Sequence, residues 1–224
     1  MGSNPTFPAI QQTNQQYGLV LFLGVIMPAV FLVSDTHFGH NGVCKFMQND
    51  GVTKLRPWET SEEMDEAMVK LWNERVGKND KVYHLGDVVI NRKALGIMRR
   101  LNGDKVLIRG NHDIFKDEEY QQHFRELRAY HVMNGMILSH IPIHPDSLGR
   151  FGVNIHGHTH SNRVMMADPF GYRENFLDLR YHCVCVEQTG FAPILFEDVV
   201  QRIKDEGGEV GFQQGNGRVE KPAN

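Results

Sequence analysis

The sequence is poor in the features that define several protein classes. Only three of its 224 residues are cysteine, and 24 basic residues face 27 acidic ones, for a net charge of −3. Three cysteines cannot build a disulfide framework, which indicates a reducing, cytoplasmic compartment. Without an excess of basic residues, we expect no strong binding to nucleic acid. The composition, 41% hydrophobic and 23% charged, is typical of a globular domain.

The N-terminal segment lacks charge altogether. Residues 1–34 contain no charged side chain, and Pro28 interrupts the apolar run over residues 17–33. A membrane helix needs about 20 apolar residues, and a secretory signal needs a basic start, so we expect no membrane association. Three interpretations stay open, in this order: a true start at Met27, a genuine hydrophobic extension, and a membrane anchor. We expect an extension (1–26), one folded domain (27–204) and a flexible tail (205–224).

The rest of the chain repeats a pattern of apolar strand, polar cluster and helix. We expect strands over 30–34, 81–85, 106–108, 136–138, 153–155 and 183–186. We expect helices over 61–76, 93–101, 117–129 and 197–204, the first of them capped by Thr60 or Ser61 and ended by Gly77. Five strands end in polar clusters: Asp35-x-His37, Gly86-Asp87, Gly110-Asn111-His112-Asp113, His140 and Gly157-His158-Thr159-His160. In sheets of this kind the site lies beyond the carboxyl ends of the strands, so these clusters should meet.

The clusters combine carboxylate and amide oxygens with imidazole nitrogens. This mixed set suits Mn²⁺, Zn²⁺ or Fe²⁺ and is too rich in nitrogen for Ca²⁺. A lone carboxylate after a strand, such as Asp87, can bridge two ions. Two ions roughly 3.5–4 Å apart can clamp a phosphoryl group and generate hydroxide near neutral pH.

In this order the five motifs resemble those of the calcineurin-like metallophosphoesterase superfamily, especially its small bacterial and phage members. The resemblance covers about residues 29–204 and implies an α/β fold, a four-layer sandwich of two mixed β-sheets flanked by helices. It implies two divalent ions, with manganese the expected metal. One ion would be held by Asp35, His37, Asp87 and His160, and the other by Asp87, Asn111, His140 and His158. Many members carry a second acid after Gly-Asp, whereas Val88-Val89-Ile90 follows here.

The same resemblance makes His112 a catalytic residue near the leaving group, as general acid or as stabiliser of the transition state. The candidate substrate-binding residues are Arg109, His40, Arg56 and Arg150. Each of them has a structural alternative of about equal weight, and for Arg109 that alternative is a pairing with Asp113. His84 and His156 are expected to be buried strand residues rather than ligands.

We therefore expect a metal-dependent phosphoric ester hydrolase in which a metal-bridging hydroxide attacks small phosphodiesters or nucleotide-like esters. The short segments 41–60 and 141–152 leave an open site with few contacts to remote parts of a substrate. The alternatives are a phosphomonoesterase, which arginines would favour, a protein phosphatase, a nuclease, and a metal-binding scaffold without activity. A scaffold would have no need of His112. The sequence leaves the oligomeric state open.

Overall fold

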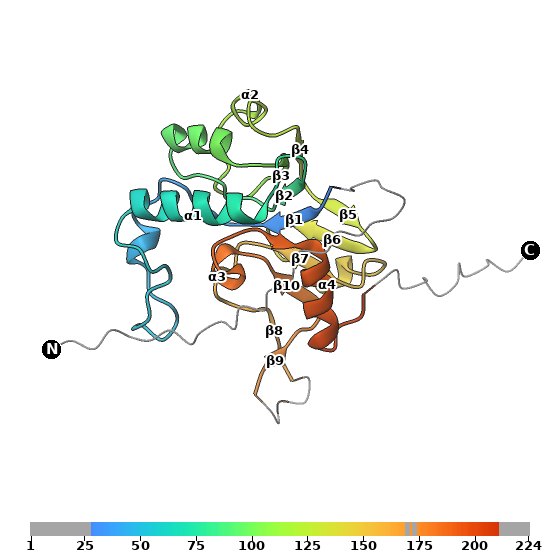
Figure 1. The fold of residues 1–224 in the computed structure, drawn as a ribbon. Helices are drawn as coiled ribbons and strands as arrows, with labels where there is room; N and C mark the ends of the chain where they lie inside the picture. Colours follow the sequence, from blue (N-terminus) through green and yellow to red (C-terminus); the bar gives the residue numbers. More distant parts are fainter. Residues whose placement is uncertain (1–27, 169–170, 172–173, 211–224) are drawn as a thin grey trace, which may run out of the picture.

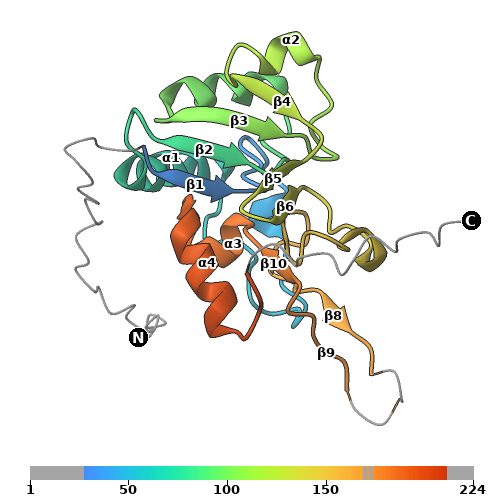
Figure 2. The same ribbon diagram turned by 90° about the vertical axis from the view of Figure 1, so that its right-hand side faces the viewer.

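Two β-sheets lie face to face, with helices flanking them (Figure 1, Figure 2). The computed structural model describes residues 28–168, 171 and 174–210. The extension 1–26 and the tail residues 211–224 lie outside the described residues, so the interpretations of both stay predictions. Within the described ranges, no helix is long and apolar enough to cross a membrane.

The first sheet has five strands in the order β11-β1-β2-β3-β4. Four of them run parallel, and the short β11 closes one edge antiparallel to β1. The bounds are Val30–Val33 (β1), Lys81–His84 (β2), Asp104–Ile108 (β3), Glu126–Arg128 (β4) and Ile194–Leu195 (β11). Central parallel strands are buried on both faces, which explains the unbroken apolar sequence of β1.

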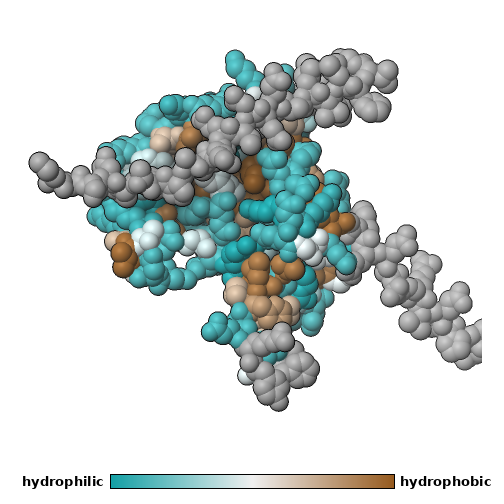
Figure 3. Space-filling model, turned by 60° about the horizontal axis from the view of Figure 1, so that its bottom comes forward, coloured by the Kyte–Doolittle hydropathy of each residue, from teal (hydrophilic) through white to brown (hydrophobic). Residues whose placement is uncertain are grey.

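The second sheet has the order β10-β7-β6-β5, in which β5 alone is antiparallel to its neighbour. The bounds are His131–Met133 (β5), Met136–Ser139 (β6), Asn154–His156 (β7) and Tyr181–Cys183 (β10). A separate pair, β8 (Met165–Met166) and β9 (Phe176–Leu177), projects from the body in Figure 2. Its Met165 and Phe176 are exposed, and Figure 3 shows apolar side chains gathered over this projection.

The two longest α-helices of the described residues are α1 (Ser61–Arg75) and α4 (Phe196–Asp205). The others are α2 (Asp117–Tyr120) and α3 (Val186–Thr189), with 3-10 helices η1 (Val43–Lys45), η2 (Arg92–Arg100) and η3 (Pro145–Ser147). Helix α1 begins as expected, because the Thr60 side chain accepts a hydrogen bond from the Glu63 N–H at 3.2 Å.

The core has layers that follow the alternation of side chains along the strands. Met68 and Trp72 of α1 pack on the outer face of the first sheet, against residues such as Val82. Between the sheets, Leu32 and Leu138 pack together with Val199 of α4. A smaller cluster that includes Ile137, Leu148 and Tyr181 covers the outer face of the second sheet. The expected architecture of two mixed sheets flanked by helices is confirmed.

Three expected elements differ from the structure. The predicted helix 117–129 ends at Tyr120, and residues 126–128 instead form β4, whose backbone pairs with β3. The helix expected over 93–101 is the 3-10 helix η2. The expected strand 183–186 ends at Cys183, since the chain then crosses to the first sheet, where the Ser34 N–H bonds the Val184 carbonyl at 3.1 Å. For β4 and for the segment after β10, tertiary pairing overrides local propensity.

Candidate metal centre

The polar residues after the strands meet as two groups of potential metal ligands. The first cluster is Asp35, His37 and His160, and the second cluster is Asp87, His140 and His158. Within each cluster the candidate ligand atoms lie within 4.8 Å of one another. Asn111 joins the second cluster, since its Oδ1 lies 2.8 Å from His140 Nε2. The structure thus brings together all seven residues that the sequence predicted as ligands.

Asp87 lies between the two clusters. Its Oδ2 is 3.4 Å from His140 Nε2 and 3.7 Å from His37 Nε2. Its other oxygen, Oδ1, accepts a hydrogen bond from the His112 N–H at 2.8 Å. One oxygen is therefore fixed by the backbone, and the other faces ligand atoms of both clusters, as a bridging role requires.

The backbone of the ligand residues is strained. Seven described residues other than glycine have positive φ, and five of them are candidate ligands: Asp35 (59°), His37 (48°), Asp87 (58°), His158 (69°) and His160 (50°). Such conformations cost roughly 1–3 kcal/mol each and persist where the surrounding structure imposes them. Their concentration here marks a functional site. Gly157 is required beside it, because a Cβ there would collide with Ser34 Oγ and with Asp35.

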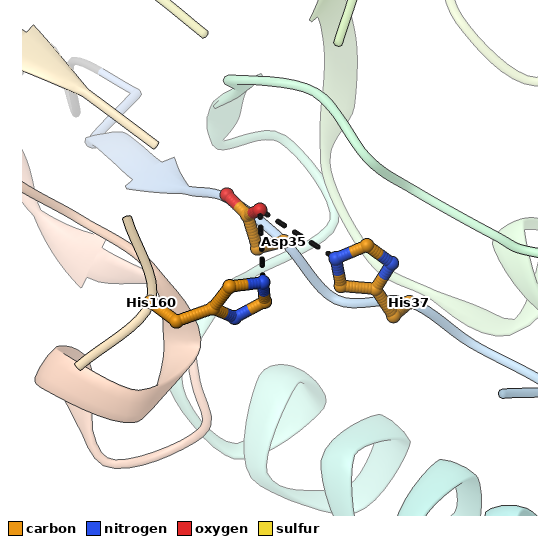
Figure 4. Close-up of side chains that lie close together, drawn as sticks. All are labelled: Asp35, His37 and His160. Carbon is orange, nitrogen blue, oxygen red and sulfur yellow. Dashed lines mark ion pairs between the residues drawn. The ribbon is translucent and has the colours of Figure 1, made fainter. Parts of the chain in front are cut away.

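The two carboxylate oxygens of Asp35 differ in their hydrogen bonding. Its Oδ2 accepts hydrogen bonds from Ser34 Oγ at 2.5 Å, the His158 N–H at 2.8 Å and Cys185 Sγ at 3.1 Å. Its Oδ1 is buried without a hydrogen-bond partner among the described residues. Figure 4 shows the carboxylate facing two imidazoles, with Oδ1 at 3.5 Å from His37 Nε2 and 3.8 Å from His160 Nε2. A buried oxygen left unpaired among imidazole nitrogens suits a cation.

Two imidazoles are oriented by partners behind them. His140 Nδ1 lies 2.7 Å from the Leu85 carbonyl, and His160 Nδ1 lies 3.1 Å from Glu187 Oε1. Each Nδ1 can therefore donate a hydrogen bond to the group behind it, and each Nε2 faces the cluster. Metal-ligating histidines have this arrangement.

The charges of the site also suit a divalent cation. Burial opposes the ionisation of Asp35, but the imidazoles of His37, His140 and His160 outweigh it and hold the pKa of that carboxyl far below its usual range. Burial likewise opposes the ionisation of Asp87, and His140 outweighs it, so its pKa is also lowered. Two buried carboxylates thus stay ionised next to nitrogen ligands, and the residues present fit the two ions that the sequence implied.

His112 lies beside the clusters rather than in them. Its ring is exposed, and the ring centroid is 5.5 Å from that of His37. A hollow of about 360 Å³ adjoins the second cluster and is lined by Arg109, Gly110, Asn111, Ala129, Ser139, His140 and Ile141. A second hollow, of about 570 Å³, is lined by residues that include Ser161 and Glu187, next to His160 of the first cluster.

The four candidate substrate-binding residues differ in their position and contacts. Arg109 lines the smaller hollow, but its guanidinium bonds the Phe115 carbonyl at 2.8 Å and also contacts Asp113 and Asp117. His40 is half-buried at the edge of the first cluster, with its ring centroid 5.8 Å from that of His37. Burial and the neighbouring cationic groups lower the pKa of His40 to about 4, so its ring is neutral at pH 7.

The remaining two arginines lie elsewhere. Arg150 is exposed, with its guanidinium 5.2 Å from the centroid of the Phe151 ring, and it lines neither hollow. Arg56 is fully buried, and all its strong hydrogen bonds are within the protein. The prediction that Arg56 binds substrate is therefore wrong, because no substrate can reach a guanidinium enclosed in this way.

Two supporting acids were missed from the sequence. Asp113 accepts hydrogen bonds from the N–H groups of Asp87 at 2.9 Å, Val88 at 3.0 Å and Gly110 at 2.8 Å, and so ties together the loops after β2 and β3. Glu187 holds His160 from behind. The sequence contained a signal only for Asp113, which follows His112 directly, since Glu187 belongs to no motif.

Known proteins are similar to this chain in sequence and in fold. Residues 29–179 match the family described as calcineurin-like phosphoesterase. The uncharacterized protein MJ1445 of Methanocaldococcus jannaschii is 37% identical over 80% of this chain and 93% of its own length. The Gene 66 protein of Mycobacterium phage D29 is 30% identical over 64% and 85%, respectively. The crystal structure of AQ665, a protein of unknown function from Aquifex aeolicus, has a similar fold, with a TM-score of 0.55 at 24% identity over 79% of this chain and 100% of that one.

Proposed function

The chain belongs to the calcineurin-like phosphoesterase family, and from this premise we propose that it hydrolyses small phosphodiesters with two divalent metal ions. The observation that carries the proposal is the arrangement around Asp35 and Asp87. Asp35 presents a buried, unpaired oxygen to two imidazoles, and Asp87 presents one oxygen to both clusters. Strained backbone at five of the ligands supports the same conclusion.

The first ion would be held by Asp35, His37, Asp87 and His160, and the second by Asp87, Asn111, His140 and His158. Bound there, two ions supply a nucleophilic water at neutral pH and offset the charge of the phosphoryl oxygens. Manganese is the proposed metal, with Zn²⁺ and Fe²⁺ as the alternatives, because all three suit a donor set that mixes carboxylate and amide oxygens with imidazoles.

The chain's own contribution to the reaction centres on His112. Its main-chain N–H is anchored to Asp87, while its ring stays exposed beside the clusters. An imidazole in this position can protonate the leaving oxygen or stabilise the charge that develops on it. His40 lies near His37 as a neutral ring, so it can accept a hydrogen bond from the substrate and adds no positive charge.

The surroundings favour a diester over a monoester. A monoester dianion would be favoured by free arginines, but Arg56 is buried and Arg109 is engaged with its own loop. The hollow lined by Asn111 and His140 of the second cluster provides space for an organic group of the ester. We propose a small-molecule substrate, and no strong nucleic-acid binding, for a chain of net charge −3. A cytoplasmic location agrees with the three free cysteines, Cys44, Cys183 and Cys185.

The test is hydrolysis of bis-nitrophenyl phosphate and of nitrophenyl phosphate by metal-free enzyme reloaded with Mn²⁺, Zn²⁺ or Fe²⁺. We expect the diester to be cleaved faster, and Mn²⁺ to restore activity best. A kcat/KM at least tenfold higher for the monoester would overturn the diesterase proposal and leave the metal centre standing. Metal binding without any hydrolysis would favour the scaffold, and salt-sensitive binding of single-stranded DNA would favour a nuclease.

A further inference from the structure

A buried ion pair stands behind the first cluster. The Arg56 and Glu187 side chains are almost completely enclosed, with exposed fractions of 0% and 3%. Glu187 Oε1 accepts a hydrogen bond from Arg56 Nε at 2.9 Å, and Arg56 Nη2 forms an ion pair with the same oxygen at 2.7 Å. The same oxygen lies 3.1 Å from His160 Nδ1. One carboxylate oxygen therefore joins the arginine to an imidazole of the first cluster.

The arginine also holds the opposite side of this cluster. Its Nη2 donates to the Asp35 carbonyl at 2.6 Å, and its Nη1 donates to the Thr36 carbonyl at 2.7 Å. These carbonyls belong to the loop in which Asp35 and His37 have positive φ. A single guanidinium thus ties down both chain segments that carry the first cluster. The planar, forked geometry of arginine suits several fixed acceptors, which a lysine ammonium cannot match.

The pair also determines the state of the His160 ring. An ionised Glu187 can only accept a hydrogen bond, so it keeps the imidazole proton on Nδ1 and leaves the Nε2 lone pair for a metal. The Arg56 guanidinium lies against Glu187 and so compensates the charge of the carboxylate that orients this ligand.

The second cluster has weaker support of this kind. The group behind His140 is the neutral carbonyl of Leu85. Asn111 and His158 are exposed. Within the described part of the chain, the one carboxylate that pairs with an imidazole of this cluster is Asp87, which is itself a ligand. The two clusters thus offer similar ligand atoms with different support.

We propose that Arg56 and Glu187 are positioning residues that make the first cluster the tighter of the two metal sites, so that it fills first. This rests on the proposed function, because it assumes that both clusters bind ions. The pair does not touch the substrate; it acts through the tautomer of His160 and through the backbone of the loop after β1.

The test is a titration of metal-free protein with Mn²⁺. Calorimetry measures the affinity of each binding step, and electron paramagnetic resonance monitors the bound ion. The variants are Glu187→Gln, which preserves shape, and Arg56→Lys, which preserves charge. Arg75→Lys is the matched control, because Arg75 of α1 donates at 3.2 Å to the carbonyl of Thr189, in the same helix α3 as Glu187, and to that of Pro193. Thermal melts of the metal-free proteins verify folding.

We expect the native protein to bind two Mn²⁺ in steps that differ at least tenfold in affinity. Glu187→Gln and Arg56→Lys should weaken the tighter step by about 10–100-fold, the usual effect of losing the partner of a ligand. The weaker step should change less than threefold, and Arg75→Lys should alter neither. If Arg56→Lys does not fold, Glu187→Gln decides alone.

The outcomes separate this inference from the proposed function. A native protein that binds no Mn²⁺ would refute the two-ion function itself. Two ions bound with equal affinity, or an unchanged tighter step in Glu187→Gln, would refute the inference and leave the function intact. Equal weakening of both steps in Glu187→Gln would also refute it, because the pair would then support the fold as a whole rather than the first site.

Discussion

The two clusters contain the same kinds of side chain, one carboxylate and two imidazoles, yet their surroundings differ. Asp35 and His37 are buried, and the charged pair Arg56–Glu187 stands behind the first cluster. The second cluster has an exposed imidazole, His158, and opens to a hollow. Similar ligands can therefore serve two purposes. A buried, rigidly supported set retains an ion, and a partly exposed set leaves room for a substrate.

The largest expected effect is at Asp87, the residue of the second cluster that also faces the first cluster. Asp87→Ala should lose a ligand of both ions and lower activity by about 10⁴-fold or more, since each ion contributes several kcal/mol. Elemental analysis should find fewer than two ions per chain. Asp178→Ala is the control, because Asp178 is a buried acid that pairs with Arg180 instead. Two ions still bound in Asp87→Ala would exclude a bridging role.

The second largest effect is expected at His112, which lies outside both clusters. His112→Ala should keep both ions and lose about 10²–10⁴-fold in turnover, the usual range for a positioned acid–base group. If His112 protonates the leaving group, the loss should shrink for nitrophenolate esters. An equal loss for good and poor leaving groups would indicate charge stabilisation, and a loss of metal would make His112 a ligand.

A matched pair of ligand variants sharpens the comparison between the clusters. His160→Ala should weaken the tighter Mn²⁺ step, and His158→Ala should weaken only the other step, each by about 10–100-fold or more. Calorimetry of metal-free protein measures both. The asymmetry would be wrong if the two variants affected the same step.

The smallest expected effect concerns the loop that carries His37. Asp65 of α1 accepts a hydrogen bond from the Gly39 N–H, at 3.0 and 3.1 Å from its two oxygens. Burial raises the pKa of Asp65 from 3.8 to about 6. A raised pKa means that the folded state binds the proton more tightly, so stability from protonation is present below pH 4 and is lost as pH rises to about 6.

Asp65→Asn cannot lose a proton, so it should raise the Tm of the metal-free protein by about 3–6 °C at pH 8 and by less at pH 4.5. Glu66→Gln is the control on the same helix, because Glu66 is an exposed partner of Arg100. A Tm difference that does not depend on pH would show that Asp65 is ionised in the folded state without cost.

The meeting of the polar clusters was predictable from strand position, and the resemblance to the phosphoesterase family then assigned the candidate ligands. Asp35, Asp87 and His140 each come just after an apolar strand, and parallel strands bring their carboxyl ends to one edge. The fold class followed from the same motifs. By contrast, the strand over residues 126–128 was missed, because a single apolar residue, Leu127, lies between two charged ones and the pairing with β3 alone makes this segment a strand.

The role of Arg56 shows what local sequence cannot reveal. An arginine in a polar loop resembles a phosphate ligand, and its actual partner Glu187 lies 131 residues away in the chain. The side chain can be buried because three acceptors from two separate segments surround it. Burial of a charge depends on such compensation, which is a property of the assembled fold.

The sequence by itself determined which atoms can bind metal, since ligand identity and the ends of strands are encoded locally. Only the tertiary structure decided how firmly each ligand is held. The positive φ of Asp35 and His37, the tautomer of His160 and the enclosure of Arg56 all depend on contacts between segments far apart in the chain. Those contacts exist only once both sheets have packed, because packing removes the water that would otherwise satisfy the same polar groups.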